Sequence, residues 1–205
     1  NKMGLISNGT TIFDAGAFAA GIGSSMTFIK KLTADGSGTN LTFVNGSSGV
    51  VIDSTYKEYI FIINNIHHEE ADRNLSVNFR DGGSNYDAQK YTTFYYARHS
   101  EDDGSAELVY RTGTDTAGTG AQQLMNGIGN SADDCGSGYL HLFDPASTSS
   151  VKHFIATTNI MQDNVQSVEH HIAGFCNVTA AIDAVQFSVN SGNIDSGTIS
   201  LYGIA

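Results

Sequence analysis

Residues 64–74, which read NNIHHEEADRN, gather the residue types that bind metal ions. Zinc prefers imidazole and carboxylate ligands, so the candidates are His67, His68, Glu69 and Glu70. The run directly follows a strand-like segment, and adjacent residues of a strand point to opposite faces. The four side chains cannot all face one ion, and we expect a solvated polar loop in preference to a metal site. For the same reason, only one imidazole of the pair His170–His171 can face a shared ligand.

Two acidic segments with glycine could supply the oxygen ligands that calcium prefers: residues 99–107 (HSEDDGSAE) and 130–138 (NSADDCGSG). Neither segment matches the EF-hand pattern, and neither is flanked by helical periodicity. Asp followed by Gly is also ordinary turn chemistry. Calcium loops and simple turns both stay open, and the sequence assigns no metal ligand.

Motifs for covalent or cofactor chemistry are absent from the sequence. No Gly-x-Ser-x-Gly element stands between a strand and a helix, and there is no phosphate-binding loop or dinucleotide fingerprint. Paired carboxylates for glycoside hydrolysis are a spatial arrangement that the sequence does not reveal. We predict that the protein is not an enzyme and assign it no catalytic residue, cofactor or metal.

The two cysteines, Cys135 and Cys176, either form one disulfide or remain free. Two in a chain of 205 residues are too few for a disulfide framework, which favours free thiols. Five Asn-x-Ser/Thr sequons begin at Asn8, Asn40, Asn45, Asn74 and Asn177. Chance explains them in a chain this rich in Asn, Ser and Thr, and we expect no secretory signal because no apolar segment near the first residue resembles one.

Aromatic residues concentrate in residues 91–98, which read YTTFYYAR. Strand alternation divides this run between two faces, with Tyr91, Thr93 and Tyr95 on one and Thr92, Phe94 and Tyr96 on the other. Aromatic faces can stack on sugars or form subunit contacts. Burial in the core is the simpler explanation, and we expect it for either face.

The composition describes a folded, acidic chain with few charges. Apolar residues make up 40% and charged residues 15%, whereas a disordered chain would combine low hydrophobicity with dense charge. The net charge of −11 repels phosphate backbones, which argues against a nucleic-acid binder. No apolar run is long enough to span a membrane as a helix.

The elements that carry these residues are expected to be strands, because helical periodicity is almost absent. Residues 59–66 and 151–158 are apolar on both faces, so we expect two central strands that are buried on both sides. Residues 122–129 are a further candidate strand. The clearest predicted strands are residues 26–33, 40–45, 56–66, 75–80, 91–98, 107–111, 138–143, 151–158, 167–176, 184–190 and 197–203.

Many short strands between glycine-rich turns predict an all-β fold, a two-sheet β-sandwich that is jelly-roll-like, with a barrel as the alternative. We expect one β-sandwich domain over residues 25–205. Residues 1–24 form an N-terminal arm that either lies on a neighbouring subunit or is loose. Residues 185–189 and 198–202 should pair as an antiparallel hairpin, with residues 190–197 as an exposed loop.

Several stretches resemble a family of structural proteins of tailed phages, common among marine phages. The similarity runs almost from end to end, and its most specific part is SGNIDSGTISLYGI near the C-terminus. The family carries no catalytic motif, so the resemblance transfers no site residue. The matching stretches are GLISNGTTIFDAGAF, YKEYIFIINNIH, NFRDGGSNYDAQKYTTFYY, GYLHLFDPASTSSVKHFIATT and AGFCNVTAAIDAVQFSVNSGNIDSGTISLYGI.

The resemblance implies a virion protein that is made in the host cytoplasm and displayed on the phage particle. A tail fibre or receptor-binding module is the first placement, binding other virion proteins and, as an additional partner, host-surface glycans. The expected assembly is a homotrimer, with no nucleic acid and no membrane insertion. A capsid decoration (cement) protein that stabilises the head is the alternative, and a carbohydrate-binding or carbohydrate-active domain is a further one.

Overall fold

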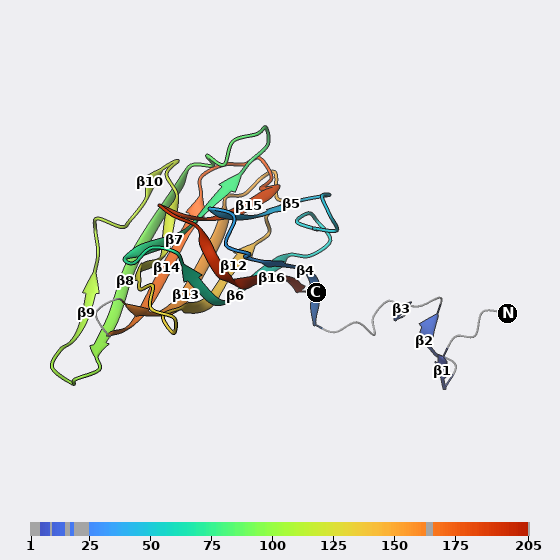
Figure 1. The fold of residues 1–205 in the computed structure, drawn as a ribbon. Helices are drawn as coiled ribbons and strands as arrows, with labels where there is room; N and C mark the ends of the chain where they lie inside the picture. The colour runs from blue at the N-terminus through green and yellow to red at the C-terminus, as the bar shows by residue number, and fades with distance from the viewer. Residues whose placement is uncertain (1–4, 9, 15–16, 19–24, 163–165, 205) are drawn as a thin grey trace.

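The computed structural model describes the chain except for residues 1–4, 9, 15–16, 19–24, 163–165 and 205 (Figure 1). The described part is built from strands, turns and loops, and it contains no helix that could cross a membrane. The predicted all-β class is therefore confirmed. The strands are β1 (Leu5–Ser7), β2 (Thr10–Asp14), β3 (Ala17–Phe18), β4 (Met26–Thr33), β5 (Asn40–Val44), β6 (Glu58–His68), β7 (Arg73–Arg80), β8 (Lys90–Ser100), β9 (Ala106–Tyr110), β10 (Ala117–Gly118), β11 (Gln122–Ile128), β12 (Gly136–Phe143), β13 (Lys152–Gln162), β14 (Gln166–Cys176), β15 (Ala184–Val189) and β16 (Ile194–Ile204).

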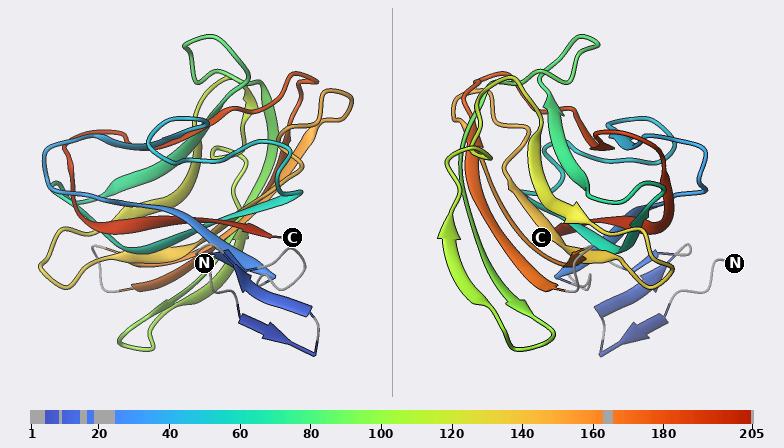
Figure 2. Two further views of the ribbon diagram at one scale, coloured as in Figure 1. Left: turned by 90° about the vertical axis from the view of Figure 1, so that its right-hand side faces the viewer. Right: turned by 60° about the vertical axis from the view of Figure 1, so that its left-hand side comes forward.

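The main body is one continuous antiparallel sheet of 13 strands that nearly closes on itself, and it folds into two facing layers, here called the larger and the smaller sheet (Figure 2). The larger sheet has the strand order β4-β16-β6-β12-β13-β14-β8-β9, and the short β10 also pairs with β8. The smaller sheet has the order β11-β7-β15-β5. One residue pair, Ile128 of β11 with Gln162 of β13, joins the two sheets at one end.

The strand pairing is that of a jelly roll, which confirms the predicted sandwich. Four pairs are nested within one another along the chain: β4 with β16, β5 with β15, β6 with β12, and β7 with β11. Successive pairs belong alternately to the larger and the smaller sheet, as in a double Greek key. The segments β8–β10 and β13–β14 are additions, and they widen the larger sheet on the side of β12.

The core lies between the sheets, and aromatic side chains connect them. Phe61 of β6 packs against Phe43 of β5 and Phe187 of β15, with ring centroids 5.3 and 5.4 Å apart. Phe154 of β13 and Phe79 of β7 form a second such contact at 5.0 Å. All five side chains are fully buried. Burial of one such side chain contributes roughly 1.5–3 kcal/mol, so this cluster is a principal source of the stability of the sandwich.

The predicted hairpin between residues 185–189 and 198–202 is wrong. β15 lies in the smaller sheet between β5 and β7, whereas β16 lies in the larger sheet between β4 and β6. The apolar side chains of both segments are buried as expected, but they reach the core from opposite sheets. The loop is also shorter than predicted, because β16 begins at the buried Ile194. The C-terminal strand is held by pairing on both of its edges.

A bulge in β6 changes which side chains reach the core. Asn65 has a φ of 50° and Gly197 of the paired strand has a φ of 106°, at a point where the register of β6 and β16 shifts. Ile66 is thereby buried together with Phe61 and Ile63, although strict alternation would place it on the other face. A Cβ on Gly197 would collide with the carbonyl oxygen of Asn65, so the bulge requires glycine.

The N-terminal strands form a small sheet of their own. β2 pairs with β1 and with β3, and within the described residues this three-stranded sheet shares no strand pair with the main body. Residues 19–24 of the predicted arm lie outside the described residues. The contact of the arm with a neighbouring subunit, and the boundary at residue 25, stay predictions.

Replacement of Phe187 by Ala tests the assigned core. The change leaves a void beside Phe43 and Phe61, and we expect the free energy of unfolding to fall by about 3–5 kcal/mol. The control is Ser188→Ala, a partly exposed position on the same strand, which should change it by less than about 0.5 kcal/mol. Urea unfolding followed by circular dichroism measures both. Equal losses for the two variants would contradict the core described above.

Candidate binding surface

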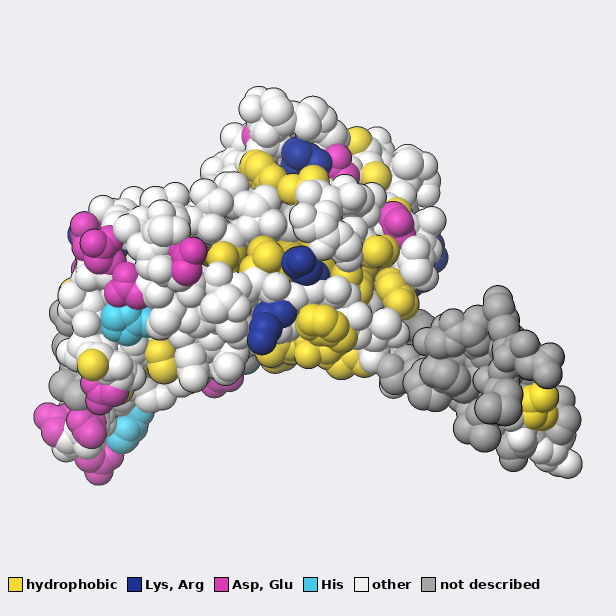
Figure 3. All heavy atoms as spheres, turned by 45° about the vertical axis from the view of Figure 1, so that its right-hand side comes forward, with side chains coloured by type: hydrophobic (Ala, Val, Ile, Leu, Met, Phe, Trp, Pro, Cys, Tyr) yellow, Lys and Arg dark blue, Asp and Glu magenta, His cyan; other side chains and the backbone are white. Residues whose placement is uncertain are grey.

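The face of the larger sheet that points away from the smaller sheet, here called the outer face, carries exposed apolar side chains. Of the large hydrophobic residues exposed in the described part of the chain, all but Ile6 belong to it. Such a concentration on one face marks an interaction site more often than scattered exposure does. The view in Figure 3 shows hydrophobic side chains gathered in patches on the molecule, with acidic side chains concentrated at one end. The outer-face residues are Met26, Phe28, Tyr91, Tyr95, Leu108, Tyr110, Tyr139 and Ile155.

The strand register arranges these side chains in rows across the sheet. The first row runs over β8, β14 and β13 and consists of Tyr91, Phe175 and His153. The second consists of Thr93, Ala173, Ile155, His141, Ile60, Tyr202 and Phe28. The third consists of Tyr110, Tyr95, His171, Thr157, Tyr139 and Ile62.

The expectation that residues 59–66 and 151–158 are buried on both sides is wrong. Tyr59 and Phe61 of β6 face the core, but Ile60 and Ile62 on the opposite face are only partly buried. Ile155 of β13 is 47% exposed. The smaller sheet covers one side of these strands, and in the described structure nothing covers the other. Their apolar residues on both faces therefore serve the core on one side and the outer face on the other.

The alternation predicted for residues 91–98 is confirmed, but the expected burial holds for one face only. Phe94 and Tyr96 are buried, and the Tyr96 hydroxyl donates a hydrogen bond to Glu107 Oε1 at 2.6 Å. Tyr91 and Tyr95 are 40% and 41% exposed on the outer face. The expected core burial of this second face is therefore wrong, and stacking or subunit contact stays open for it.

Histidines on the outer face are mostly paired with carboxylates. The imidazole of His171 also stacks on Tyr95, with ring centroids 4.9 Å apart and an angle of 10°. Four pairs have nitrogen–oxygen distances of 2.9–3.2 Å: His67 with Asp195, His99 with Asp103, His141 with Glu58, and His171 with Glu169. His153, beside Phe175, forms no such pair within the described residues.

One set of outer-face residues has the order of a catalytic triad. Thr157 Oγ1 lies 3.3 Å from His171 Nδ1, and His171 Nε2 lies 3.1 Å from Glu169 Oε1. Acyl transfer also needs free N–H groups that stabilise an oxyanion. Thr157 lies in mid-strand, where β13 is paired with β12 and β14, so the neighbouring backbone groups are engaged in the sheet. The arrangement orients His171 and does not support nucleophilic catalysis.

The candidate metal ligands of residues 64–74 point in different directions. His67 contacts Asp195 and the carbonyl oxygen of Ser131, whereas His68 is fully buried on the opposite side of β6. Glu69 accepts a hydrogen bond from the Asn193 backbone N–H at 3.0 Å, and Glu70 pairs with Arg73. His170 and His171 likewise face opposite sides, as predicted. The described residues contain no group of three His, Cys, Asp or Glu side chains that could share an ion.

The two acidic segments form turns whose carboxylates bond to their own loops. In residues 99–107, Asp102 Oδ1 accepts the Gly104 N–H at 2.9 Å, which helps close the turn between β8 and β9. In residues 130–138, the buried Asp134 accepts the Ser131 N–H at 2.9 Å. These bonds account for the positions of both carboxylates by turn chemistry.

Both cysteines are free thiols, and Cys176 lies in a polar row that sequence reasoning missed. Lys90, Cys176 and Lys152 are cross-strand neighbours on β8, β14 and β13, and all three are fully buried on the inner face. Burial raises the pKa of Cys176 to about 12 and lowers that of Lys90 to about 8. Lys90 and Phe94 lie an even number of residues apart on β8, as do Lys152 and Phe154 on β13. This spacing places each lysine on the same face as a core phenylalanine, and it was the sequence signal for their burial.

Backbone carbonyl groups satisfy the two buried ammonium groups. Lys90 Nζ donates to the Gly120 carbonyl oxygen at 2.7 Å and also to Asn78 Oδ1. Lys152 Nζ donates to the Val178 carbonyl oxygen at 3.0 Å and also to that of Ala180. Lysine is rarely this buried unless it is paired, so these bonds fix the loops after β10 and β14 to the sheet.

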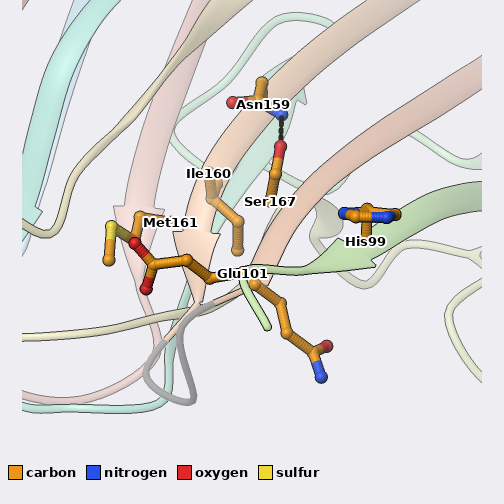
Figure 4. Close-up of a pocket in the computed structure, with 7 residues that line it drawn as sticks. His99, Glu101, Asn159, Ile160, Met161 and Ser167 are labelled. Atoms are coloured by element: carbon orange, nitrogen blue, oxygen red, sulfur yellow. Dashed lines mark hydrogen bonds between the residues drawn. The ribbon is translucent and has the colours of Figure 1, made fainter. Parts of the chain in front are cut away.

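Two hollows lie on the widened part of the larger sheet. One, of about 360 Å³, lies where β8 and β13 end and β14 begins, and Figure 4 shows His99, Asn159 and Ser167 among its side chains. Three of its polar residues are partnered, since Asn159 Nδ2 donates to Ser167 Oγ at 3.0 Å and His99 pairs with Asp103. The other, of about 510 Å³, lies among the first two rows of the outer face.

Comparison with known proteins adds no further assignment. No protein-family model matches this chain, and no curated protein matches it. The resemblance to tailed-phage proteins therefore stays a prediction, and the structural evidence on function comes from the outer face.

Stability should depend on pH because two buried histidines resist protonation. Burial lowers the pKa of His68 and of His170 from the usual 6.5 to about 4. The nearby His67 lowers the pKa of His68 further, whereas the charge of Asp195 and a backbone hydrogen bond with Arg73 oppose the shift, and Arg111 and His171 lower the pKa of His170 further. Below pH 6.5 the unfolded chain takes up protons that the folded chain does not bind. We expect each histidine to lower the free energy of unfolding by about 1.4 kcal/mol per pH unit between pH 6.5 and 4.

Urea unfolding between pH 7.5 and 5 measures this dependence. The variants His68→Gln and His170→Gln should each show a shallower slope than the unaltered protein, whatever their stability at pH 7.5. Identical slopes for the unaltered protein and both variants would contradict the assignment.

Proposed function

We propose that the protein is a structural protein of a bacteriophage virion, displayed on the particle as a tail fibre or receptor-binding module. The observation that carries the proposal is the outer face, a broad apolar and aromatic surface on a jelly roll. A surface of this kind is suited to binding other macromolecules. Jelly rolls are recurrent modules of viral particles, and the sequence resemblance to tailed-phage proteins supports the same context.

The chemistry of the outer face suits protein contacts as well as target binding. Aromatic side chains and methionine are enriched at protein interfaces and dominate their energetics. Near β4 the face presents Met26 and Phe28, and the Phe28 ring lies edge-on to Tyr202 at 5.5 Å. We assign this end to contacts between subunits of a homotrimer, because the predicted arm directly precedes β4. We assign the other end of the outer face, formed by β8, β14 and β13, to binding of the target.

A capsid decoration protein is the second candidate. The observation that favours it is the separate pairing of β1–β3, since a small N-terminal sheet could attach a compact domain to a head shell. Both candidates place the protein in the virion, and they differ in copy number. A decoration protein is present in many copies per particle, and a tail protein in few.

Quantitative mass spectrometry of purified virions tests the proposal. We expect the protein in virions at a copy number close to that of tail proteins. A ratio close to that of the major capsid protein would favour the decoration role instead. Absence from purified virions, with presence in the lysate, would contradict both.

The subunit contact predicts a specific effect of Phe28→Asp. Phe28 is 56% exposed and lies outside the core, so the variant should fold, but a buried charge should dissociate the trimer. Thr112→Asp, at an exposed position after β9 on the opposite edge of the larger sheet, is the control and should stay trimeric. Light scattering coupled to gel filtration measures the mass. A monomeric unaltered protein at high concentration would contradict the trimer.

A further inference from the structure

The larger of the two hollows lies on β8, β14 and β13. It arises because the second row of the outer face has short side chains on β8 and β14, whereas the first row has large ones. Thr93 and Ala173 are short and exposed, and they form its floor. The row of Tyr91, Phe175 and His153 stands on one side, and by register the row of Tyr95 and His171 follows on the other. Ile155 lines one end. The result is a shallow trough of about 510 Å³ that runs across the strands.

One wall of the trough is aromatic along its length. The Phe175 ring lies 5.7 Å from the Tyr91 ring and 5.8 Å from the His153 ring, measured between centroids. Neighbouring strands are about 4.8 Å apart, so the three rings span about 10 Å. A pyranose ring has a face of C–H groups that packs on aromatic rings, and this wall is long enough for a disaccharide.

Polar groups at the trough can bond to hydroxyl groups. The Tyr91 hydroxyl oxygen accepts a hydrogen bond from Gln89 Nε2 at 3.1 Å, which leaves its proton to donate. Thr93 Oγ1 donates to the Ala173 carbonyl oxygen at 3.3 Å, which leaves its lone pairs to accept. The ring nitrogens of His153 form no hydrogen bond within the described residues and can serve in either role. Sugar hydroxyls need both donors and acceptors of this kind.

The charge of the lining selects a neutral ligand. Tyrosine, threonine, phenylalanine, isoleucine and one histidine line the trough, and none of the described residues in it is Asp, Glu, Lys or Arg. The chain as a whole carries a net charge of −11, which repels anionic polysaccharides. A ligand that matches this lining has hydroxyl groups and no net charge.

The sheet geometry argues against a peptide that adds a strand. β13, β14 and β8 are each paired on both edges, so their backbone groups are already bonded. A ligand here meets side chains only, which excludes recognition by β-augmentation. Aromatic stacking and hydroxyl bonding by side chains remain as the means of recognition.

We infer that this trough is a binding subsite for a neutral oligosaccharide, with Tyr91 and Phe175 as the stacking platform and His153 and Thr93 as hydroxyl partners. The inference rests on the proposed receptor-binding role and deepens it, since it gives the chemical class of the target and the residues that contact it.

The test is binding of the purified protein to an array of neutral oligosaccharides of glucose, mannose, galactose and N-acetylglucosamine, with alginate oligosaccharides as the anionic arm. The affinity of each oligosaccharide that binds on the array is then measured by isothermal titration calorimetry. We expect Tyr91→Ala to weaken binding about tenfold, since an aromatic contact is worth up to about 1.5 kcal/mol. Tyr91→Phe keeps the ring and should lose less. Tyr139→Ala removes a tyrosine of similar exposure outside the trough and should leave the affinity unchanged.

Three outcomes would overturn the inference: no binding to any neutral oligosaccharide, binding to alginate alone, or equal losses for Tyr91→Ala and Tyr139→Ala. A change of oligomeric mass in Tyr91→Ala without saccharide binding would identify the trough as a subunit contact instead. The virion measurement is independent of this one. A protein found in virions that binds no saccharide overturns the subsite only, whereas a saccharide-binding protein absent from virions overturns the virion role only.

Discussion

The contact of Phe61 with Phe43 and Phe187 is the interaction on which the sandwich depends, because it joins the middle of the larger sheet to two strands of the smaller one. The smaller sheet has few strands and lies on one side only. Each strand of the larger sheet thus has one face that packs against the smaller sheet and supplies stability. The opposite face is not needed for this packing, and together these faces make up the outer face.

The strands and the fold class could be predicted because both depend on short-range patterns. Alternation locates β8 and β14, and Gly, Asn and Asp clusters mark their ends. Strand partners depend on contacts between distant segments, which is why β15 and β16 were paired with each other although each pairs elsewhere. The bulge at Asn65 interrupts the alternation and moves Ile66 to the core, and no local pattern announces it.

The candidate surface could be predicted only in part, because alternation shows which residues share a face but not whether a second layer covers that face. Tyr91 and Tyr95 were placed together correctly, but their burial was assumed. Apolar residues on both sides of β6 and β13 suggested two covering layers, whereas one layer is present. No prediction was made for Lys90, whose spacing from Phe94 along β8 places it on the buried face despite its charge.

The nested pairing also constrains how the chain is made. Thr33 of β4 pairs with Thr198 of β16, and Val44 of β5 pairs with Ala184 of β15. During synthesis the early strands therefore emerge long before their partners, and contacts this distant in sequence form slowly. β6 is likewise synthesised well before its partner β12, and until then its apolar residues are exposed on both sides. The nascent chain therefore exposes apolar strands between translation and folding, and we expect chaperones and slow synthesis at low temperature to favour recovery of the folded protein.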